Sequence, residues 1–244
     1  LGNSLTTKVS ADGRTLLDGG RALTSKEVSL LLTHSTPQFW PIVLTFVYTG
    51  MRVGEILAMK WKYFNDGEDE GGDPKGAKPS ICPIGSYAVE ETVDADGQFS
   101  EPKTESSRAE IALSPVVVQA LREQRAKVAQ AKLQAGKEWE DHDLIFPRLD
   151  YCKNWGTARS SDIIRSALKR TARRAGIGHV RPHDLRHTCA SLLIAQDINI
   201  KQVSSHLRHS SVSFTLDIYG HLYPDDRNEV AHAMDQALGI AENG

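Results

Sequence analysis

The chain has 244 residues, of which 40% are hydrophobic and 25% charged, and this composition is typical of a soluble globular protein with one large domain or two small ones. Its formal net charge of −2 argues weakly against a nucleic-acid partner. The three cysteines, Cys82, Cys152 and Cys189, are odd in number and widely spaced, which excludes a disulfide framework and a zinc ribbon and indicates a reducing cytosol.

The beginning of the chain is polar and rich in glycine, so we expect residues 1–22 to form a linker or an irregular arm. No basic segment followed by an apolar one opens the chain, and we therefore expect no secretory signal. The chain does not begin with methionine, from which we expect it to be a fragment of a longer protein.

Three helices are expected next. Thr24 and Glu27 have the spacing of a capping box and begin the first. The segment "PQFWPIVLTFVYTG" predicts a second, more buried helix that ends at Gly50, and "RVGEILAMKW" predicts a short third one. The apolar run over residues 35–51 is too short, and too interrupted by proline, to span a bilayer comfortably.

A loop and then a small sheet follow. Residues 64–80 break the helical pattern, and within them "DGEDEGGD", residues 66–73, is an acidic insertion without an evident role. The segments "YAVEETV", "QFSEPKT" and "RAEIAL" have the composition of strands, and Asp96-Gly97 is a hairpin signal. We expect an antiparallel sheet of about three strands over residues 80–113.

Helices dominate the second half of the chain. Ser114-Pro115 begins a long helix that runs to Gly136. Further helices are expected over residues 158–175, 183–195, 199–207, 211–222 and 225–239. This order predicts an α+β fold, namely a mostly helical domain with a small antiparallel β-sheet of about three strands.

Basic side chains are concentrated in one region of this acidic chain. Residues 148–186 hold ten basic residues and three acidic ones. Such a region is either a surface that contacts phosphate groups or a solvated helix face, and charge alone does not decide between them.

The segment "RPHDLRHTCASLLI" places groups with suitable chemistry on one helix face, because His183, Arg186 and His187 are three and four residues apart. A planar guanidinium suits phosphate, and imidazole transfers protons near neutral pH. A zinc pair at His183 and His187 is an alternative. However, Asp184 stands where the common zinc proteases have glutamate, and no third ligand is evident.

Taken alone, each candidate group also has an ordinary structural explanation. Arg52 can pair with Glu55 three residues on, and Lys103 can be solvated at the tip of the predicted hairpin. Each histidine can be a buried, hydrogen-bonded core residue. The combination of motifs is more specific than its parts.

Together the motifs resemble those of the tyrosine recombinases, the phage integrase family. The family pattern "TGxRxxEIxxLxW" is matched by "TGMRVGEILAMKW", and "KTxxSxRxxxL" is matched by "KTESSRAEIAL". The pattern "HDLRHTxAS" is matched by "HDLRHTCAS", and "LGHxSxxxTxxxYxH" is similar to "LRHSSVSFTLDIYGH". The resemblance covers about residues 24–223 in the right order. One departure is Arg208, where the family usually has glycine.

The resemblance implies a set of six catalytic residues: Arg52, Lys103, His183, Arg186, His209 and Tyr219. The tyrosine would attack the scissile phosphate and form a 3′-phosphotyrosyl link. The two arginines would clamp the phosphate oxygens, with His209 as a further donor. Lys103 would protonate the leaving 5′-oxygen, and His183 would exchange a proton with the tyrosine.

Three more residues are expected to orient these groups or to contact DNA: Glu55, Arg208 and His187. For Glu55 we expect mainly the orientation of Arg52 or of the His183 region. For His187 we expect a place in the core or behind the catalytic groups.

By this resemblance, the protein would be a site-specific recombinase or integrase that cuts and rejoins DNA strands without metal, ATP or another cofactor. Its partners would be double-stranded DNA, further copies of itself in a tetramer on DNA, and accessory DNA-bending proteins, with no membrane contact. Two alternatives stay open, namely relaxation without strand exchange, as by a type IB topoisomerase, and a DNA-binding module without activity. The expected location is the cytoplasm of a bacterial host cell.

The same resemblance divides the chain into three parts. Residues 1–22 would be a linker or the remnant of a connection to a missing N-terminal DNA-binding domain, and residues 23–224 would form the catalytic domain. Residues 225–244 would form a helical tail, in which Val230, Met234 and Leu238 are spaced by four. The tail can pack on its own domain or dock on a neighbouring protomer, and we slightly favour docking.

Overall fold

The computed structural model of the chain describes residues 8–9, 15–17, 20–67, 85–94, 97–101, 108–149, 154–223 and 227–239. Lys103, Cys82, Cys152 and most of the acidic insertion lie outside the described residues. None of the helices in the described part of the chain combines the length and the apolar character that a bilayer crossing needs.

Helices make up most of the described structure, and the sheets are small. The α-helices are α1 (Ser25–Thr33), α2 (Trp40–Thr49), α3 (Val53–Leu57), α4 (Pro115–Ala135), α5 (Ser161–Arg174), α6 (Pro182–Ile194), α7 (Ile200–Leu207), α8 (Val212–Tyr219) and α9 (Arg227–Ala237). The 3₁₀ helices are η1 (Trp61–Tyr63), η3 (Gly136–Glu138) and η4 (Gly220–Leu222). The strands are β1 (Lys8–Val9), β2 (Thr15–Leu17), β3 (Gly20–Arg21), β4 (Phe64–Asn65), β5 (Ser86–Val89), β6 (Thr92–Val93), β7 (Phe99–Ser100) and β8 (Ala109–Ala112). The predicted α+β fold is confirmed.

The first helices begin and end at the predicted local signals. Thr24 and Glu27 form the capping box at the start of α1. The helix α2 ends at Gly50, whose φ of 56° lies in the left-handed region that favours glycine. Because the chain turns sharply there, Arg52 comes to lie at the N-terminus of α3.

The sheets are small and antiparallel. β4, β5 and β8 form a three-stranded sheet in that order, with Tyr87 opposite Ile111. β6 and β7 form a separate antiparallel pair, and Asp96 of the predicted turn lies outside the described residues. The prediction of a small antiparallel sheet is confirmed, although β4 precedes the predicted range and the strand expected at "QFSEPKT" lies in the separate β6–β7 pair. The two residues of β4 are too few to show an alternating pattern.

The region expected to be a linker or irregular arm contains paired strands. β1, β2 and β3 form an antiparallel sheet, and β3 lies against α6. The backbone nitrogen of Arg21 donates to Asp184 Oδ1 at 3.3 Å, and that of Leu23 donates to Thr188 Oγ1 at 2.9 Å. These hydrogen bonds hold the described end of the segment on the helix that carries the histidine–arginine motif.

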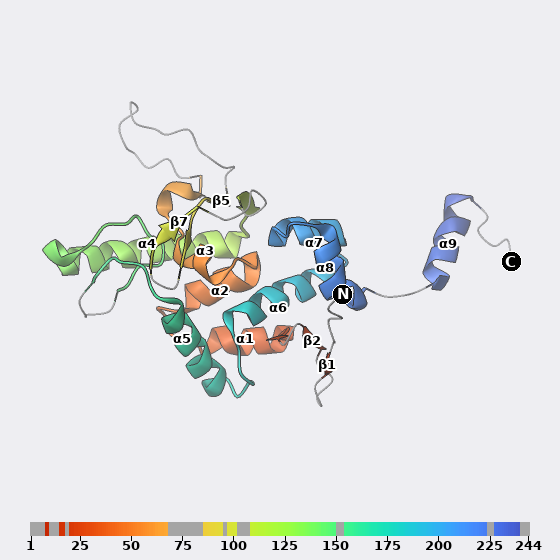
Figure 1. Cartoon of the computed structure of the whole chain (residues 1–244), viewed down its shortest axis with the longest axis horizontal. Coiled ribbons are helices and arrows are strands. Elements are labelled where there is room, and N and C mark those ends of the chain that lie inside the picture. The colour runs from red at the N-terminus through yellow and green to blue at the C-terminus, as the bar shows by residue number, and fades with distance from the viewer. Residues whose placement is uncertain are drawn as a thin grey trace, which may run out of the picture.

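The helix α6 joins two parts of the core. Figure 1 shows α6 in the middle of the molecule, and it contacts α2, α5, α7 and β3. Leu185 belongs to the large cluster formed with α1–α5 and the sheet, whereas Cys189, Ala190 and Ile194 belong to a second cluster with α7 and α8. Burying one leucine fully contributes about 1.5–3 kcal/mol. Residues near the middle of α6 therefore lie at the boundary between two packed bodies.

The helix α9 lies apart from the other helices in Figure 1. Its described side chains, residues 232–239, are exposed, including the large apolar Met234 and Leu238. This helix therefore leaves the apolar side chains of Met234 and Leu238 uncovered.

Candidate active site

Arg186 lies at this boundary and is buried, with 3% of its surface exposed. Its Nη1 donates to the carbonyl oxygen of Gly50 at 2.5 Å, and its Nη2 donates to that of Leu207 at 2.5 Å. These carbonyls lie at the C-terminal ends of α2 and α7. Carbonyl groups at such an end have no donor within their helix, and they carry partial negative charge. One guanidinium thus joins two helix ends, close in the chain to Arg52 and His209.

Arg52 is held by Glu55 at the start of α3. The backbone nitrogen of Arg52 donates to Glu55 Oε2 at 2.8 Å, and its Nη1 donates to Glu55 Oε1 at 2.8 Å. The Arg52 side chain is 48% exposed, whereas the carboxylate is 3% exposed. The ion pair between Arg52 and Glu55 that the spacing predicted is therefore present. It leaves the Arg52 guanidinium accessible at the surface.

Arg208 binds the same carboxylate. It follows α7 with φ 57°, in the left-handed region, and its buried Nη2 donates to Glu55 Oε2 at 2.5 Å. Burial of Glu55 would raise its pKa, but the charge of Arg208 and the hydrogen bonds from Arg52 outweigh this effect, and the pKa lies below its ordinary value. Glu55 is therefore an anion between two arginines.

The hydroxyl of Tyr219 lies against His187. It is 2.8 Å from His187 Nδ1, and both residues are 1% exposed. His183 is exposed and packs edge-on against His187, with ring centroids 4.5 Å apart. From the sequence we expected His183 to exchange a proton with Tyr219. In the structure the tyrosine hydroxyl contacts His187, and the ring of His183 packs against the ring of His187.

His209 is fixed by a residue that sequence reasoning missed. Its Nδ1 lies 2.7 Å from Oγ1 of Thr215, which is fully buried, and its ring packs edge-on against Phe214 at 4.9 Å. The threonine occupies the "T" of the pattern "LGHxSxxxTxxxYxH", and this match was a signal that could have identified it.

Burial and the arginine charges set the protonation states of the site. Burial, with the like charges of Arg52 and Arg208, lowers the pKa of Arg186 to about 10, so it remains a cation near neutral pH. Burial and neighbouring cations lower the pKa of His187 to about 4 and that of His209 to about 3, so both rings are neutral.

Burial also raises the pKa of Tyr219, which the charge of Arg186 only partly offsets. The phenol is therefore protonated, and the site combines cationic arginines with a neutral tyrosine.

The structure brings together most of the residues that the sequence singled out. The charge of Arg52 lowers the pKa of both Arg186 and Arg208, and Arg52 and Arg208 share the carboxylate of Glu55. The charge of Arg186 also acts on the pKa of Tyr219. Lys103 lies outside the described residues, so its place in the site stays a prediction. Among the described residues, no group of three or more His, Cys, Asp or Glu side chains is arranged to hold a metal ion.

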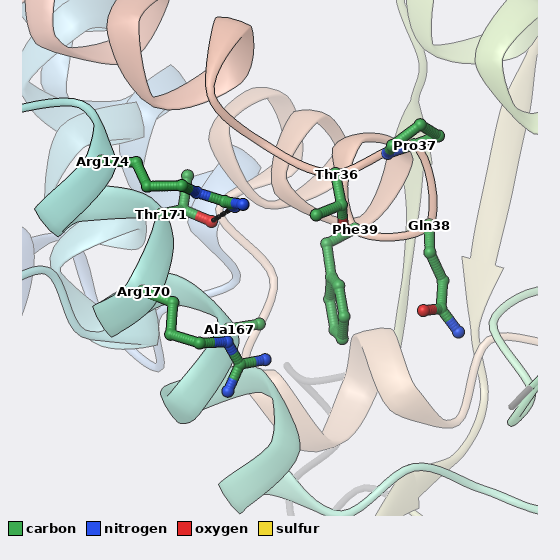
Figure 2. Close-up of a pocket in the computed structure, with 8 residues that line it drawn as sticks. All are labelled: Thr36, Pro37, Gln38, Phe39, Ala167, Arg170, Thr171 and Arg174. Atoms are coloured by element: carbon green, nitrogen blue, oxygen red, sulfur yellow. Dashed lines mark hydrogen bonds between the residues drawn. The ribbon is translucent and has the colours of Figure 1, made fainter.

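A second basic feature lies on α5. Figure 2 shows Arg170 and Arg174 reaching from this helix toward the loop that contains Thr36 and Phe39. Together with Thr171 these residues help to line a cavity of about 420 Å³. Two guanidinium groups one turn apart beside hydroxyl groups form a surface suited to phosphate.

Comparison with known proteins agrees with this geometry. The pattern of the phage integrase family matches residues 21–225. The ICEBs1 integrase of Bacillus subtilis (strain 168) is 30% identical over 199 residues, which cover 78% of this chain and 46% of that protein. A tyrosine recombinase XerC-like protein of Caldanaerobacter subterraneus subsp. tengcongensis is 26% identical over 189 residues, covering 77% and 46%. The chain thus spans about half the length of these curated relatives.

Solved structures share the fold. The integrase of the transposon Tn1549, in complex with transposon right end DNA, superposes with a TM-score of 0.64 at 17% identity, covering 89% of this chain and 66% of that one. The catalytic domain of bacteriophage HP1 integrase gives a TM-score of 0.53 at 15% identity, covering 91% and 98%. With the family pattern matched over most of its length, and with the arginine, histidine and tyrosine motifs gathered around one site, the chain belongs to the phage integrase family.

Proposed function

We propose that this protein cuts and rejoins DNA strands through a 3′-phosphotyrosyl link to Tyr219, without metal or ATP. The observation that carries the proposal is the position of Arg186. Its guanidinium binds the carbonyls of Gly50 and Leu207 and so gathers the segments of Arg52 and His209 around one point. A cluster of fixed donors at one point suits a single phosphate whose negative charge grows in the transition state.

Each group has a role that fits its chemistry. Arg52 and Arg186 clamp the nonbridging oxygens of the scissile phosphate, and His209, held by Thr215, adds a neutral donor. The oxygen of Tyr219 attacks phosphorus, the bond to the 5′-oxygen breaks, and the energy of the ester is kept for rejoining.

Two proton transfers complete the reaction. The phenol of Tyr219 loses its proton as it attacks, and the leaving 5′-oxygen gains one. We assign the second transfer to Lys103 and the first to His183, acting on Tyr219 through His187 or after the tyrosine moves. The new 5′-hydroxyl attacks the phosphotyrosyl link of another strand, which gives strand exchange.

The basic face of α5 is the proposed contact for the DNA backbone. Its exposed cationic side chains are Arg165, Lys169, Arg170, Arg173 and Arg174. Cationic groups that replace counterions on DNA make binding fall steeply with salt. We expect the cavity beside Arg170 to receive one backbone phosphate.

The whole protein is proposed to act on double-stranded DNA as a tetramer in the bacterial cytoplasm, with an N-terminal DNA-binding domain before residue 23. The exposed Met234 and Leu238 of α9 support docking of the tail on a neighbouring protomer, since an uncovered apolar helix face favours a partner.

The proposal is tested with a pool of nicked duplexes of random sequence. The nick lets the short cleaved strand diffuse away, so a covalent adduct accumulates and is seen by denaturing electrophoresis. Wild-type protein should give an adduct, and Tyr219→Phe should give none while still binding DNA.

Tyr223→Phe is the matched control. Its hydroxyl donates to the carbonyl of Ile198 at 2.8 Å, outside the proposed chemistry, and this variant should form the adduct like wild type. A covalent band with Tyr219→Phe, or no band with wild type, refutes the proposal.

A further inference from the structure

Arg208 occupies a backbone conformation in which glycine is the easier residue. Its φ is 57°, and its backbone nitrogen closes the end of α7 by donating to the carbonyl of Ser205 at 3.0 Å. A side chain is strained in this region because Cβ approaches the following carbonyl group. The helix ending itself does not need an arginine, so the contacts of the side chain have to account for it.

The side chain of Arg208 points into the protein rather than to solvent. It is 1% exposed, and it forms an ion pair with Glu55 Oε2 at 2.5 Å. Its Nη1 also donates to the carbonyl of His206 at 3.2 Å. Both partners of the ion pair are fully enclosed, so the guanidinium has a fixed position and orientation.

Glu55 connects this guanidinium to Arg52. Oε1 accepts from the Arg52 guanidinium, whereas Oε2 accepts from both the Arg52 backbone and Arg208. We propose that Arg208 is a positioning residue, which holds Glu55 so that Arg52 is presented to the scissile phosphate. This inference rests on the proposed function.

The charges give a reason for an arginine at this position. With one carboxylate between Arg52 and Arg208, this group has a net charge of +1, and Arg186 adds a second positive charge. A phosphodiester carries one negative charge, and its five-coordinate transition state carries a second. The net charge of +2 on the four side chains therefore matches the two negative charges of the transition state. If residue 208 were glycine, the carboxylate of Glu55 would pair with Arg52 alone and would compete with the phosphate for the Arg52 guanidinium.

The test compares Arg208→Gly with wild type on the duplex that the random pool yields most often. The rate of adduct formation is measured in a single turnover on an ordinary phosphate and on a methylphosphonate at the scissile position. A methylphosphonate has lost one charged nonbridging oxygen, so it depends less on Arg52. We expect a loss of roughly 10- to 100-fold on the phosphate, as for other small displacements of catalytic groups, and a much smaller loss on the methylphosphonate.

A double-variant comparison tests the route through Arg52. In an Arg52→Ala background, Arg208→Gly should cause little further loss, because the residue that it positions is already absent. Fully additive losses, or equal losses on both substrates, would overturn the proposal.

Asp197→Gly is the matched control for backbone strain. Asp197 is exposed and has the same φ of 57°, and its replacement should leave the rate unchanged. If Arg208→Gly reacts as fast as wild type, the positioning role is wrong while the proposed function stands. If wild type itself forms no adduct, the proposed function fails, and the role of Arg208 fails with it.

Discussion

We expect the free energy of unfolding to fall as the solution is acidified from neutrality, because two histidines of the site are neutral in the folded chain. Burial lowers the pKa of His187 to about 4 and that of His209 to about 3, below the ordinary value of 6.5. In that pH window the unfolded chain binds protons that the folded chain does not. Stability is therefore lost as the pH falls.

The magnitude for His187 follows from the two pKa values. An extra proton on the unfolded chain lowers the stability by about 1.4 kcal/mol for each pH unit. Between the ordinary pKa of 6.5 and the folded pKa of about 4, this amounts to roughly 3 kcal/mol. The contribution is fully present above pH 6.5 and is lost as the pH falls to about 4. For a chain of this size it corresponds to a decrease in Tm of roughly 6–12 °C.

The assay is urea unfolding, followed by tryptophan fluorescence, at closely spaced pH values for wild type and His187→Gln. The variant loses the contact with Tyr219, so its stability at neutral pH also changes, and only the slopes against pH are compared. His187→Gln should lose roughly 3 kcal/mol less than wild type over the window. His179→Gln, which removes an exposed imidazole, is the control and should follow wild type. If wild type and His187→Gln lose stability in parallel, His187 is not a buried neutral ring.

Three further changes test the site. Glu55→Gln should lower the free energy of unfolding by about 3–5 kcal/mol, because the buried Arg208 loses its counter-charge. In urea unfolding, the double variant Glu55→Gln with Arg208→Met should recover much of this loss, and a larger loss in the double variant would contradict the role of the pair. Gly50→Ala should lower Tm, because φ is 56° and a Cβ would lie 2.5 Å from Leu207 Cδ2, so an unchanged Tm would contradict this packing. Lys103→Ala should form adduct slowly on ordinary DNA but regain its rate when sulfur replaces the bridging 5′-oxygen, since a thiol with a pKa of about 8.5 leaves without much protonation; failure to regain it would exclude Lys103 as the acid.

The sequence predicted the features that depend on near neighbours in the chain. Thr24 and Glu27 are three residues apart, and so are Arg52 and Glu55, so their hydrogen bonds follow from helical spacing. The turn at Gly50 follows from its freedom to adopt a positive φ. The order of the family motifs then placed the arginine and tyrosine segments in one fold.

The contacts between distant segments were beyond such reasoning. Glu55 meets Arg208 across 153 residues of chain, and Tyr219 meets His187 across 32. These pairs join residues that lie on different helices, and spacing in the sequence does not reveal how helices pack. The strand β2 was missed for another reason: Asp-Gly pairs flank it, but its three residues show no clear alternation.

The protonation states of the site argue for an order of events in the proposed reaction. In the free protein the phenol of Tyr219 is buried, protonated and hydrogen-bonded to the neutral ring of His187. A phosphate near Arg186 would weaken the cation's pull on the phenol, so phosphate binding does not by itself ionise the tyrosine. The same negative charge raises the pKa of nearby imidazoles, because an opposite charge favours the protonated form. His187 is then a stronger base than in the free protein, and it already lies 2.8 Å from the hydroxyl. In the proposed reaction, loss of the proton from Tyr219 would therefore be coupled to the binding of DNA, and the phenol would stay protonated until a phosphate lies beside Arg186.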